Sequence, residues 1–346
     1  MKIAHLLIRH SPVFGAAERY AVELANEQAR QHEVSFILAS GSSRSRPDAL
    51  AHRLDPRVLV IPVPGWQPLS ILAAHRALLY LAPDVAHAHL AAAERAIRGL
   101  RGLCLRVATL HHRYDARRHR HLDALIALSP WQLAEIPEQQ RANTRQINTW
   151  TAIPPFDAAS RRRIRSQLGL GDGDFLVGAL GCAEHRQGLD VLIGAFTRAS
   201  PADARLAIVG SGRQWPRLRR QAPAAIIMPG FTDQPHDWLC AFDALVDPAR
   251  DQPVGLVLLE AMATGLPILA TATSSARQLA PLIGRPLART GSAADLAQAL
   301  KQLASERPPR QSYDLGNFQL QQNAGEIGDF YQQQLSRQPA YLSHTG

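Results

Sequence analysis

A run near the C-terminal end, DQPVGLVLLEAMATGLPI (251–268), places a carboxylate inside an apolar segment that has the character of a helix. Glu260 is that carboxylate, and Gln252 lies eight residues before it, in the polar loop that leads into the segment. A carboxylate among apolar neighbours costs free energy unless a partner compensates it. The run therefore predicts either a polar ligand for Glu260 or a buried partner, such as a backbone group or an arginine.

Histidines occupy two apolar segments of the first half. His111 lies in the segment TLHH (109–112), and His87 and His89 alternate along DVAHAH. Imidazole changes its charge near neutral pH, so His111 and His89 are candidates for a hydrogen bond or a proton relay to a substrate. A structural histidine with satisfied hydrogen bonds is the alternative for each. The wider set of histidines lacks carboxylates at metal-binding spacing, and we predict no metal site.

Arginine dominates the charge of the chain. The formal net charge is +9, and Lys2 and Lys301 are the only lysines among the 38 basic residues. Such a charge attracts anions, which leaves nucleic acid, anionic membrane surfaces and nucleotide-sugar phosphates as candidate partners. Because no helix-turn-helix or aromatic stacking pattern accompanies the charge, we do not predict nucleic-acid binding.

Composition and length indicate a globular protein with two domains. Hydrophobic residues make up 46% and charged residues 19% of the 346 residues. The three cysteines, Cys104, Cys182 and Cys240, form no C-x-x-C pair, which argues against a disulfide framework and fits a reducing cytoplasm. The most apolar stretch, SILAAHRALLYLAP, is interrupted by His75 and Arg76 and is too short to span a membrane.

Apolar runs alternate with amphipathic stretches, which predicts parallel strands joined by helices. The first series of predicted strands is KIAHLLI, EVSFILA, RVLVIPV, DVAHAHL, RVATLHH and DALIALS, with a helix at AAERYAVELANEQARQ. A linker and lead-in helix begin near residue 151. The second series is FLVGALG, ARLAIVGSG, AIIMPGF, ALVDPA and PILATA, with helices between, and a final helix follows at GNFQLQQNAGEIGDFYQQQL. We predict an α/β fold of two doubly wound units in tandem, facing a cleft at the carboxyl ends of their strands.

The order of these motifs resembles the GT-B glycosyltransferases of family 4, which are retaining, nucleotide-sugar-dependent enzymes. The resemblance is carried by GAAER (15–19), DVAHAH (84–89), TLHH (109–112), DALIALS (123–129), RQGLDVLIGAF (186–196), LAIVGSG (206–212), PGF (229–231) and the run at 251–268. It implies an acceptor-side Rossmann-like domain at 1–155, a nucleotide-sugar domain at 156–318, and a segment at 319–346 whose helix crosses back to the first domain.

The resemblance implies a cytoplasmic, metal-independent transferase. It would move a sugar from a nucleotide diphosphate-sugar to a glycan or lipid-linked acceptor with retention, in bacterial cell-surface polysaccharide or lipopolysaccharide synthesis. UDP-sugars are favoured over GDP-sugars as the donor, and no cofactor is implied.

The resemblance also assigns site residues. Glu260 would accept hydrogen bonds from the ribose, and Gln252 stands where the family has the first acid of its glutamate-x7-glutamate pair, which holds the donor sugar. Arg186 would stabilise the leaving diphosphate, and His111 would act near the sugar and the acceptor. The remaining residues assigned to donor binding are Gly15, Gly210, Gly212, Phe231, Thr232, Gly255, Leu256 and Val257.

Three positions depart from the family pattern. Cys182 and Gln187 stand where the phosphate clamp has an arginine and a lysine, and Gln252 replaces an acid. Arg213 and Asp251 are possible substitutes for the lost charges. These departures keep a second hypothesis open, a catalytically degenerate scaffold that binds glycan or a partner enzyme. Another nucleotide-sugar enzyme on this fold, such as an epimerase, is a third.

Two further segments carry charge. The loop HHRYDARRHRHLD (111–123) is by default a solvated charged loop. In related enzymes this region lies on the acceptor side and can touch anionic lipid, so peripheral contact with the inner face of the cytoplasmic membrane is a hypothesis. The triplet DGD (172–174) imitates a metal-binding D-x-D motif, but it precedes a strand at the start of the second domain, and we assign it no metal.

Overall fold

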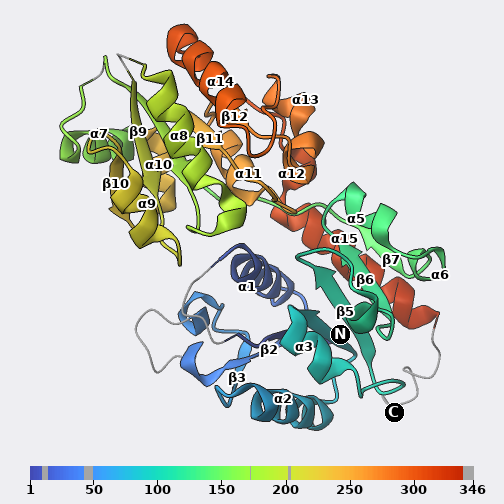
Figure 1. Ribbon diagram of the computed structural model, residues 1–346. Helices are drawn as coiled ribbons and strands as arrows, with labels where there is room; N and C mark the ends of the chain where they lie inside the picture. The colour runs from blue at the N-terminus through green and yellow to red at the C-terminus, as the bar shows by residue number, and fades with distance from the viewer. Residues whose placement is uncertain (10–14, 43–49, 172, 202–203, 338–346) are drawn as a thin grey trace. The chain divides into compact units, whose positions relative to one another are not determined.

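The computed structural model describes residues 1–9, 15–42, 50–171, 173–201 and 204–337 (Figure 1). The chain separates into two compact units, one formed by Met1–Trp150 with Asn317–Gly346 and the other by Thr151–Gly316. Each unit has its own parallel sheet with helices on both faces, which confirms the predicted α/β class of two doubly wound units. The division by contacts falls near residues 150 and 316, beside the predicted boundaries at 155 and 318.

The first unit contains a seven-stranded sheet in the order β3-β2-β1-β4-β5-β6-β7. Its strands are β1 (Lys2–Leu7), β2 (Glu33–Ala39), β3 (Leu59–Val63), β4 (Val85–His89), β5 (Leu105–Leu110), β6 (Ala124–Ala127) and β7 (Thr144–Gln146). The sequence predicts the first six, whereas β7 consists of three half-buried polar residues and has no apolar pattern. Strand order reverses between β1 and β4, where ligands bind in folds of this kind.

Helices cover both faces of this sheet. Those of the unit are α1 (Ala16–Gln28), α2 (Gln67–Leu81), α3 (Ala91–Ile97), α4 (Ala116–His119), α5 (Pro130–Glu135), α6 (Glu138–Arg141) and α15 (Leu320–Ser336). Short 3-10 turns lie at Ser40–Ser42, Leu50–Arg53 and Gly316–Phe318. Figure 1 shows α15, the final helix, beside β5 and β6 of the first sheet, and α15 packs against α1 and β5.

The two faces of the first sheet differ in chemistry. The face toward α2 and α3 is an apolar core of alanine, leucine and isoleucine side chains, such as Leu6, Ala86 and Ala108. Successive side chains of a strand point to opposite faces, and His5 of β1 pairs in register with His87 of β4. The other face, toward α1 and α15, therefore carries histidines where a parallel sheet is ordinarily apolar.

The second unit contains a five-stranded sheet in the order β10-β9-β8-β11-β12. Its strands are β8 (Phe175–Leu180), β9 (Ala204–Val209), β10 (Ile227–Gly230), β11 (Ala244–Asp247) and β12 (Ile268–Ala270). Its helices are α7 (Ala158–Gln167), α8 (Leu189–Ala199), α9 (Trp215–Gln221), α10 (Pro235–Ala241), α11 (Leu256–Ala263), α12 (Ser274–Gln278), α13 (Ala280–Ile283) and α14 (Ala293–Glu306), with a 3-10 turn at His185–Gln187. Strand order reverses here between β8 and β11.

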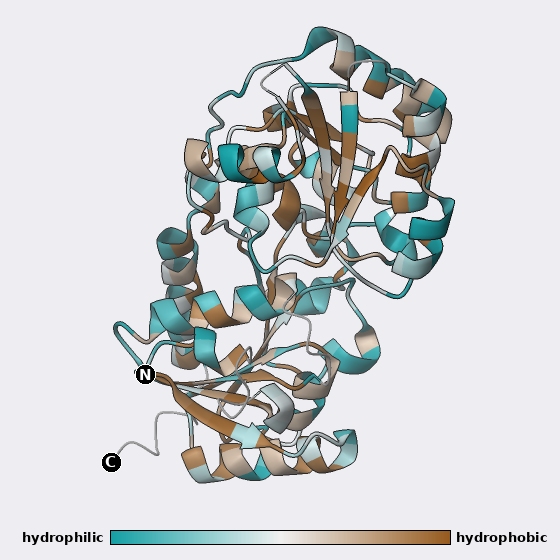
Figure 2. Cartoon of the chain, turned by 90° about the vertical axis from the view of Figure 1, so that its left-hand side faces the viewer, coloured by the Kyte–Doolittle hydropathy of each residue, from teal (hydrophilic) through white to brown (hydrophobic). Residues whose placement is uncertain are grey.

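Apolar strands form the centre of each unit, and the polar residues lie mainly on the outer helices and loops (Figure 2). In the second unit, α8 and α14 pack on one face of the sheet through a continuous set of buried aliphatic residues. On the other face, the buried ring of Phe242 lies over Gly178, in the middle of β8. The absence of a side chain at Gly178 is what allows the ring to approach the strand.

We expect Gly178→Ala to destabilise the second unit. A Cβ at this position would lie 2.1 Å from the ring of Phe242, and overpacking a core costs roughly 1–3 kcal/mol or more. The matched control is Gly194→Ala, on the exposed side of α8, where an added Cβ meets nothing within 4 Å. That change should stabilise the helix by about 0.5–1 kcal/mol. Urea unfolding followed by circular dichroism measures both; equal midpoints for the two variants would contradict this packing.

Candidate functional site

Two polar side chains meet at the carboxyl end of β11, where strand order in the second sheet reverses. Asp247 is the last residue of β11, and Nε2 of Gln252 donates a hydrogen bond to its Oδ2 at 3.0 Å. Asp247 is 4% exposed and Gln252 is 5% exposed. Asp247 lies inside a predicted strand, and nothing in the sequence indicates that Gln252 bonds to it.

Burial raises the pKa of Asp247 to about 6, because the carboxylate loses solvation, and the N–H of Ala249 opposes this effect in part. At neutral pH Asp247 is therefore ionised and accepts the N–H of Gln252. This hydrogen bond orients the amide of Gln252 and leaves its carbonyl oxygen as an acceptor. The negative charge of the pair therefore lies on Asp247, next to Gln252, where the sequence has an amide in place of an acid.

Glu260 lies in the middle of α11 rather than at its start, and it is 4% exposed. Gly255 is the N-cap of this helix and is buried against Ser275. Leu256 and Val257 are half-buried in the first turn. The N–H of Leu256 already donates to the carbonyl of Val254 at 2.9 Å, so this amide is engaged within the loop.

Gly210 and Gly212 hold two loops of the second unit together. A Cβ on Gly210 would lie 1.9 Å from the carbonyl oxygen of Gly181, and a Cβ on Gly212 would lie 2.7 Å from the amide nitrogen of Ala183. Both glycines have positive φ values, 145° and 154°. Ala183 also donates to the carbonyl of Ser211 at 2.8 Å. The sequence motif VGSG therefore has a structural explanation in close backbone packing.

Arg186 lies in the loop after β8, and its backbone and its side chain have different roles. Its carbonyl oxygen accepts hydrogen bonds from the amides of Arg250 and Asp251, at 2.7 and 3.3 Å, which ties the loop after β8 to the loop after β11. Its side chain is exposed and forms no ion pair with any described residue. Arg250 differs, because it makes a two-pronged ion pair with Asp190. Arg186 is thus a cation available to an anionic ligand.

The other residues assigned from the sequence lie around the same sheet edge. Phe231 follows β10 and is 65% exposed, which suits stacking on a planar ligand. The hydroxyl of Thr232 accepts the N–H of Gln234 at 3.1 Å. Arg213 and Asp251 are both exposed. Asp172, of the DGD triplet, lies outside the described residues.

In the first unit, Gly15 caps α1 and is engaged by the same helix. Its N–H donates to Oε2 of Glu18 at 3.1 Å, and Glu18 pairs with Arg9 through Oε1. Glu18 is 3% exposed, because its side chain folds back on the helix start. A Cβ on Gly15 would lie 3.0 Å from Oε2 of Glu18. The amide that the sequence assigns to donor binding is therefore occupied by Glu18.

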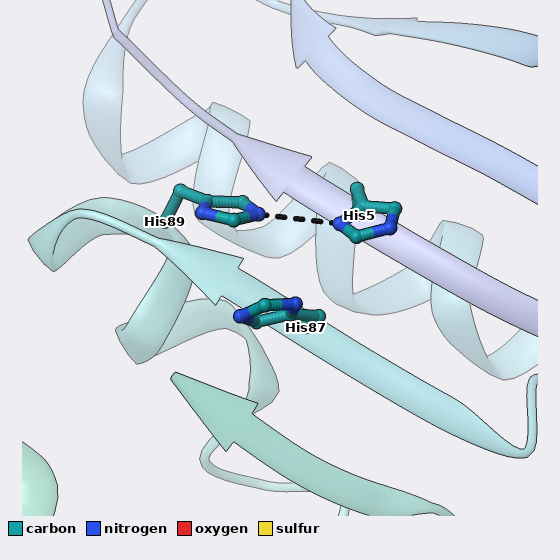
Figure 3. Close-up of side chains that lie close together, drawn as sticks. All are labelled: His5, His87 and His89. Atoms are coloured by element: carbon teal, nitrogen blue, oxygen red, sulfur yellow. Dashed lines mark hydrogen bonds between the residues drawn. The ribbon is translucent and has the colours of Figure 1, made fainter. Parts of the chain in front are cut away.

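His111 is the open end of a row of buried imidazoles. Its Nε2 lies 3.1 Å from Nδ1 of His89, whose Nε2 lies 3.2 Å from Nδ1 of His5. Figure 3 shows His5 on β1 beside His87 and His89 on β4, with the hydrogen bond between His5 and His89. Nε2 of His5 lies 2.8 Å from Oε1 of Gln28 on α1. His5 is absent from the candidates that the sequence gives.

His87 has separate partners. Its ring nitrogens bond to the hydroxyls of Thr109 and Tyr331, at 2.7 and 2.6 Å. Within the described residues, His5, His87 and His89 are three potential metal ligands whose nearest nitrogens lie within 4.8 Å of one another. Burial lowers the pKa of His5 to about 4 and that of His111 to about 3. The imidazoles are therefore neutral at physiological pH.

The loop 111–123 has arginines of two kinds. Arg113 forms an ion pair with Glu135, and Arg118 forms ion pairs with Glu94 and with Asp115 of the same loop. Arg117 and Arg120 are exposed, and neither makes an ion pair with a carboxylate anywhere in the described ranges. Of the described helices, none is long and apolar enough to cross a membrane.

Two family models match the chain, one in each unit. Residues 17–150 match the model described as "Glycosyltransferase Family 4". Residues 175–306 match the model described as "Glycosyl transferases group 1". Between them the two matches span most of both sheets.

Curated relatives share part of their length with this chain. The "Lipopolysaccharide core biosynthesis mannosyltransferase LpsB" of Rhizobium meliloti is 31% identical over 164 residues, which are 44% of this chain and 46% of that protein. The "D-inositol 3-phosphate glycosyltransferase" of Xylanimonas cellulosilytica is 27% identical over 223 residues, 56% of this chain and 51% of that protein. The chain thus spans about half the length of the curated relatives it matches.

Solved structures match over nearly the whole chain. Sucrose-phosphate synthase from Thermosynechococcus elongatus aligns with a TM-score of 0.80 at 20% identity, covering 97% of this chain and 99% of that one. Anabaena Alr3699/HepE, solved in complex with UDP-glucose, aligns with a TM-score of 0.74 at 18% identity, covering 97% and 99%. At this identity the likeness establishes the fold, and the predicted GT-B architecture is confirmed.

We expect Asp247 to make stability depend on pH. Its folded-state pKa, about 6, exceeds the ordinary value of 3.8. The carboxyl group therefore contributes stability that is fully present below its unfolded-state pKa and is lost as the pH rises through about 6. The loss amounts to about 3 kcal/mol at about 1.4 kcal/mol per pKa unit. Asp247→Asn should remove this dependence in urea unfolding series between pH 4 and 7.5.

Two further variants sharpen this expectation. Gln252→Glu places a second carboxyl group against the first, which raises the shared pKa and should steepen the loss of stability with rising pH. Asp233→Asn changes an exposed carboxylate of the same unit and is the matched control. Parallel pH profiles for the wild type and Asp247→Asn would show that Asp247 is not the buried acid described above.

Proposed function

We propose a function from one premise: this chain belongs to the group 1 and family 4 glycosyltransferases, with one family model matching in each unit. On that premise it transfers a sugar from a nucleotide diphosphate-sugar to a glycan or lipid-linked acceptor, with retention of the anomeric configuration. The process it serves is bacterial cell-surface polysaccharide or lipopolysaccharide synthesis, as the name of the LpsB relative supports.

The observation that carries the proposal is the polar site at the reversal point of the second sheet. Gln252, fixed by Asp247, offers an amide oxygen and a second N–H to sugar hydroxyls. Glu260, buried on the following helix, would accept hydrogen bonds from the ribose. A free guanidinium at Arg186 matches a diphosphate in charge and geometry, so the leaving group would be stabilised without a metal or a cofactor.

UDP-sugars are the favoured donors. The HepE structures, which share this fold, contain UDP and UDP-glucose. Phe231 would lie against the nucleotide base, because an exposed aromatic ring at a strand end offers a stacking surface. His111, in the first unit, would form a hydrogen bond to a hydroxyl of the sugar or of the acceptor.

One observation favours a second candidate function. The positions of Cys182 and Gln187 lack the cations that the family pattern places there, and the amide of Gln252 is already bonded to Asp247. A site with this reduced positive charge is compatible with a scaffold that binds glycan or a partner enzyme without transfer. Donor binding separates the two candidates.

We expect calorimetry to detect binding of UDP-glucose or another UDP-sugar, and weaker binding of GDP-, ADP- and dTDP-sugars. Glu260→Ala should weaken UDP-sugar binding roughly 10- to 100-fold, because a hydrogen bond to a charged group contributes about 1.5–3 kcal/mol. Glu306→Ala, on an exposed position of α14, is the matched control and should bind as the wild type does.

Three results would decide against parts of this proposal. A wild type that binds no nucleotide-sugar would favour the scaffold. Unchanged affinity in Glu260→Ala would place the nucleotide elsewhere. Donor binding without transfer to any extracted lipid-linked acceptor would separate binding from catalysis.

We propose that the first unit carries a surface that binds anionic membranes. Large apolar side chains are exposed on α2 and on the residue before it: Trp66, Leu69, Leu72, Leu79 and Tyr80. α3 lies between α2 and α4, the helix of the arginine loop. Exposed apolar residues beside unpaired arginines are typical of a surface that rests on anionic lipid.

We expect Arg117→Ser with Arg120→Ser to weaken binding to vesicles that contain phosphatidylglycerol. Each basic residue near an anionic surface contributes about 1 kcal/mol, so the pair should reduce the partition coefficient at least roughly tenfold. Sedimentation with vesicles at fixed salt measures it. The control pair, Arg217→Ser with Arg219→Ser on α9, removes the same charge from the second unit. An equal loss in the control would attribute binding to net charge alone.

A further inference from the structure

The histidine face of the first sheet is more polar than its position requires. His5, His87 and His89 are fully buried, on the side of the sheet that α1 and α15 cover. Burying an unpaired polar group costs free energy, whereas apolar side chains fill the opposite face of the same strands. Stability alone does not explain three imidazoles in this place.

The protonation of the imidazole rings determines which ring donates each hydrogen bond. Burial lowers the pKa of His5, His89 and His111, so each ring is neutral and carries one N–H and one lone pair. A hydrogen bond between two neutral imidazoles therefore needs the N–H of one and the lone pair of the other. In a row of such rings, the orientation of the first determines the orientation of the last.

Gln28 sets the first orientation. Its Oε1 lies 2.8 Å from Nε2 of His5, and a carbonyl oxygen only accepts, so Nε2 of His5 carries the proton. Nδ1 of His5 then accepts from Nε2 of His89 at 3.2 Å. Nδ1 of His89 accepts in turn from Nε2 of His111 at 3.1 Å. The last ring is left with a lone pair on Nδ1.

We propose that Gln28, His5 and His89 form a buried hydrogen-bond chain that holds the proton of His111 on Nε2, so that Nδ1 of His111 is kept as an acceptor for a ligand hydroxyl. Gln28, His5 and His89 are positioning residues, because they act through His111. His111 is half-buried, and its Nδ1 has no hydrogen-bond partner in the described part of the chain. The identity of the hydroxyl, on a sugar, rests on the proposed function; the fixed tautomer does not.

The side chains that pack against this hydrogen-bond chain are compatible with neutral imidazoles. Tyr20 of α1 presents its ring edge to His89 and His111, at centroid distances of 5.8 and 5.2 Å. Phe36 of β2 stacks on His5 at 6.1 Å. His87 lies against His89, but hydroxyl groups occupy both of its nitrogens. A hydroxyl both donates and accepts, so His87 imposes no direction on the row.

A metal ion is the competing explanation for the same histidines. Ligation by His5, His87 and His89 would require each to give up a hydrogen bond described above, and the nitrogen of His89 nearest His5 would have to lose its proton. The geometry favours the chain, because the contacts from Gln28 to His111 run in series at hydrogen-bond distances of 2.8, 3.2 and 3.1 Å, whereas the ligand atoms of His5, His87 and His89 are only within 4.8 Å of one another.

The test is the protonation state of His111, read by long-range ¹H–¹⁵N correlation on protein labelled with ¹⁵N-histidine. His111→Asn assigns the signal. We expect the wild type to show His111 protonated on Nε2. His5→Phe keeps a ring but removes the acceptor for His89, and should give a mixture of His111 tautomers. His5→Asn keeps an amide oxygen near the Nδ1 position and should restore the wild-type state.

His87→Phe is the matched control, since it replaces a buried histidine of the same face outside the chain, and should leave His111 unchanged. The proposal is overturned by His111 protonated on Nδ1 in the wild type, by an unchanged tautomer in a folded His5→Phe, or by an equal shift in His87→Phe. Stoichiometric zinc in the purified protein, measured by elemental analysis, would also overturn it. If His5→Phe does not fold, the wild-type spectrum decides.

Activity gives an independent readout. With donor turnover, His5→Phe should lower kcat/KM roughly tenfold, in line with one weakened hydrogen bond, and His5→Asn should recover most of it. A wild type without turnover would contradict the proposed transferase function. The tautomer measurement needs no substrate, and it would still decide whether the hydrogen-bond chain from Gln28 to His111 exists.

Discussion

Desolvation of polar side chains at the reversal points of the two sheets is the constraint on which the chemistry of this protein depends. In the first unit, the two strands that flank this point carry the buried groups His5 and His89, and in the second unit β11 ends in the buried Asp247. A buried polar group persists only where hydrogen bonds replace water. The partners that satisfy these groups, Gln28 and Gln252, are both glutamines. Gln28 orients the imidazole of His5, and Asp247 orients the amide of Gln252, so neither glutamine adds a charge.

The sequence was sufficient for the fold because the fold depends on patterns that repeat. Six of the seven strands of the first sheet, and all five of the second, are short apolar runs between amphipathic segments. Burial on both faces of a parallel sheet produces this pattern directly. β7 lacks it, because Thr144–Gln146 is a half-buried edge strand. α14 is absent from the helices named from the sequence, although its apolar residues recur at helical spacing.

The site was less predictable, because its hydrogen bonds join residues that no local pattern connects. Gln252 and Glu260 stand out by position in one run, but the carboxylate that orients Gln252 lies within a predicted strand, and no local pattern connects the two residues. Gly15 carries a glycine signal that the structure explains by the capping contact with Glu18. His5 gives no signal at all, since a single histidine in an apolar strand becomes meaningful only when β4 is placed beside β1.

The close packing of loops in the second unit limits how this edge of the sheet can bind an anion. Gly210 and Gly212 let the loop after β9 approach the loop after β8 so closely that backbone groups there bond to one another. The amide of Leu256 is likewise engaged by Val254. A phosphate at this edge would therefore depend more on guanidinium groups than on a cradle of free amides. Rigid loops keep Arg186 in place through its carbonyl oxygen, while its side chain stays free to turn toward an anion. For an anion bound at this edge, Arg186 would supply a positive charge in place of the cations that are absent at Cys182 and Gln187.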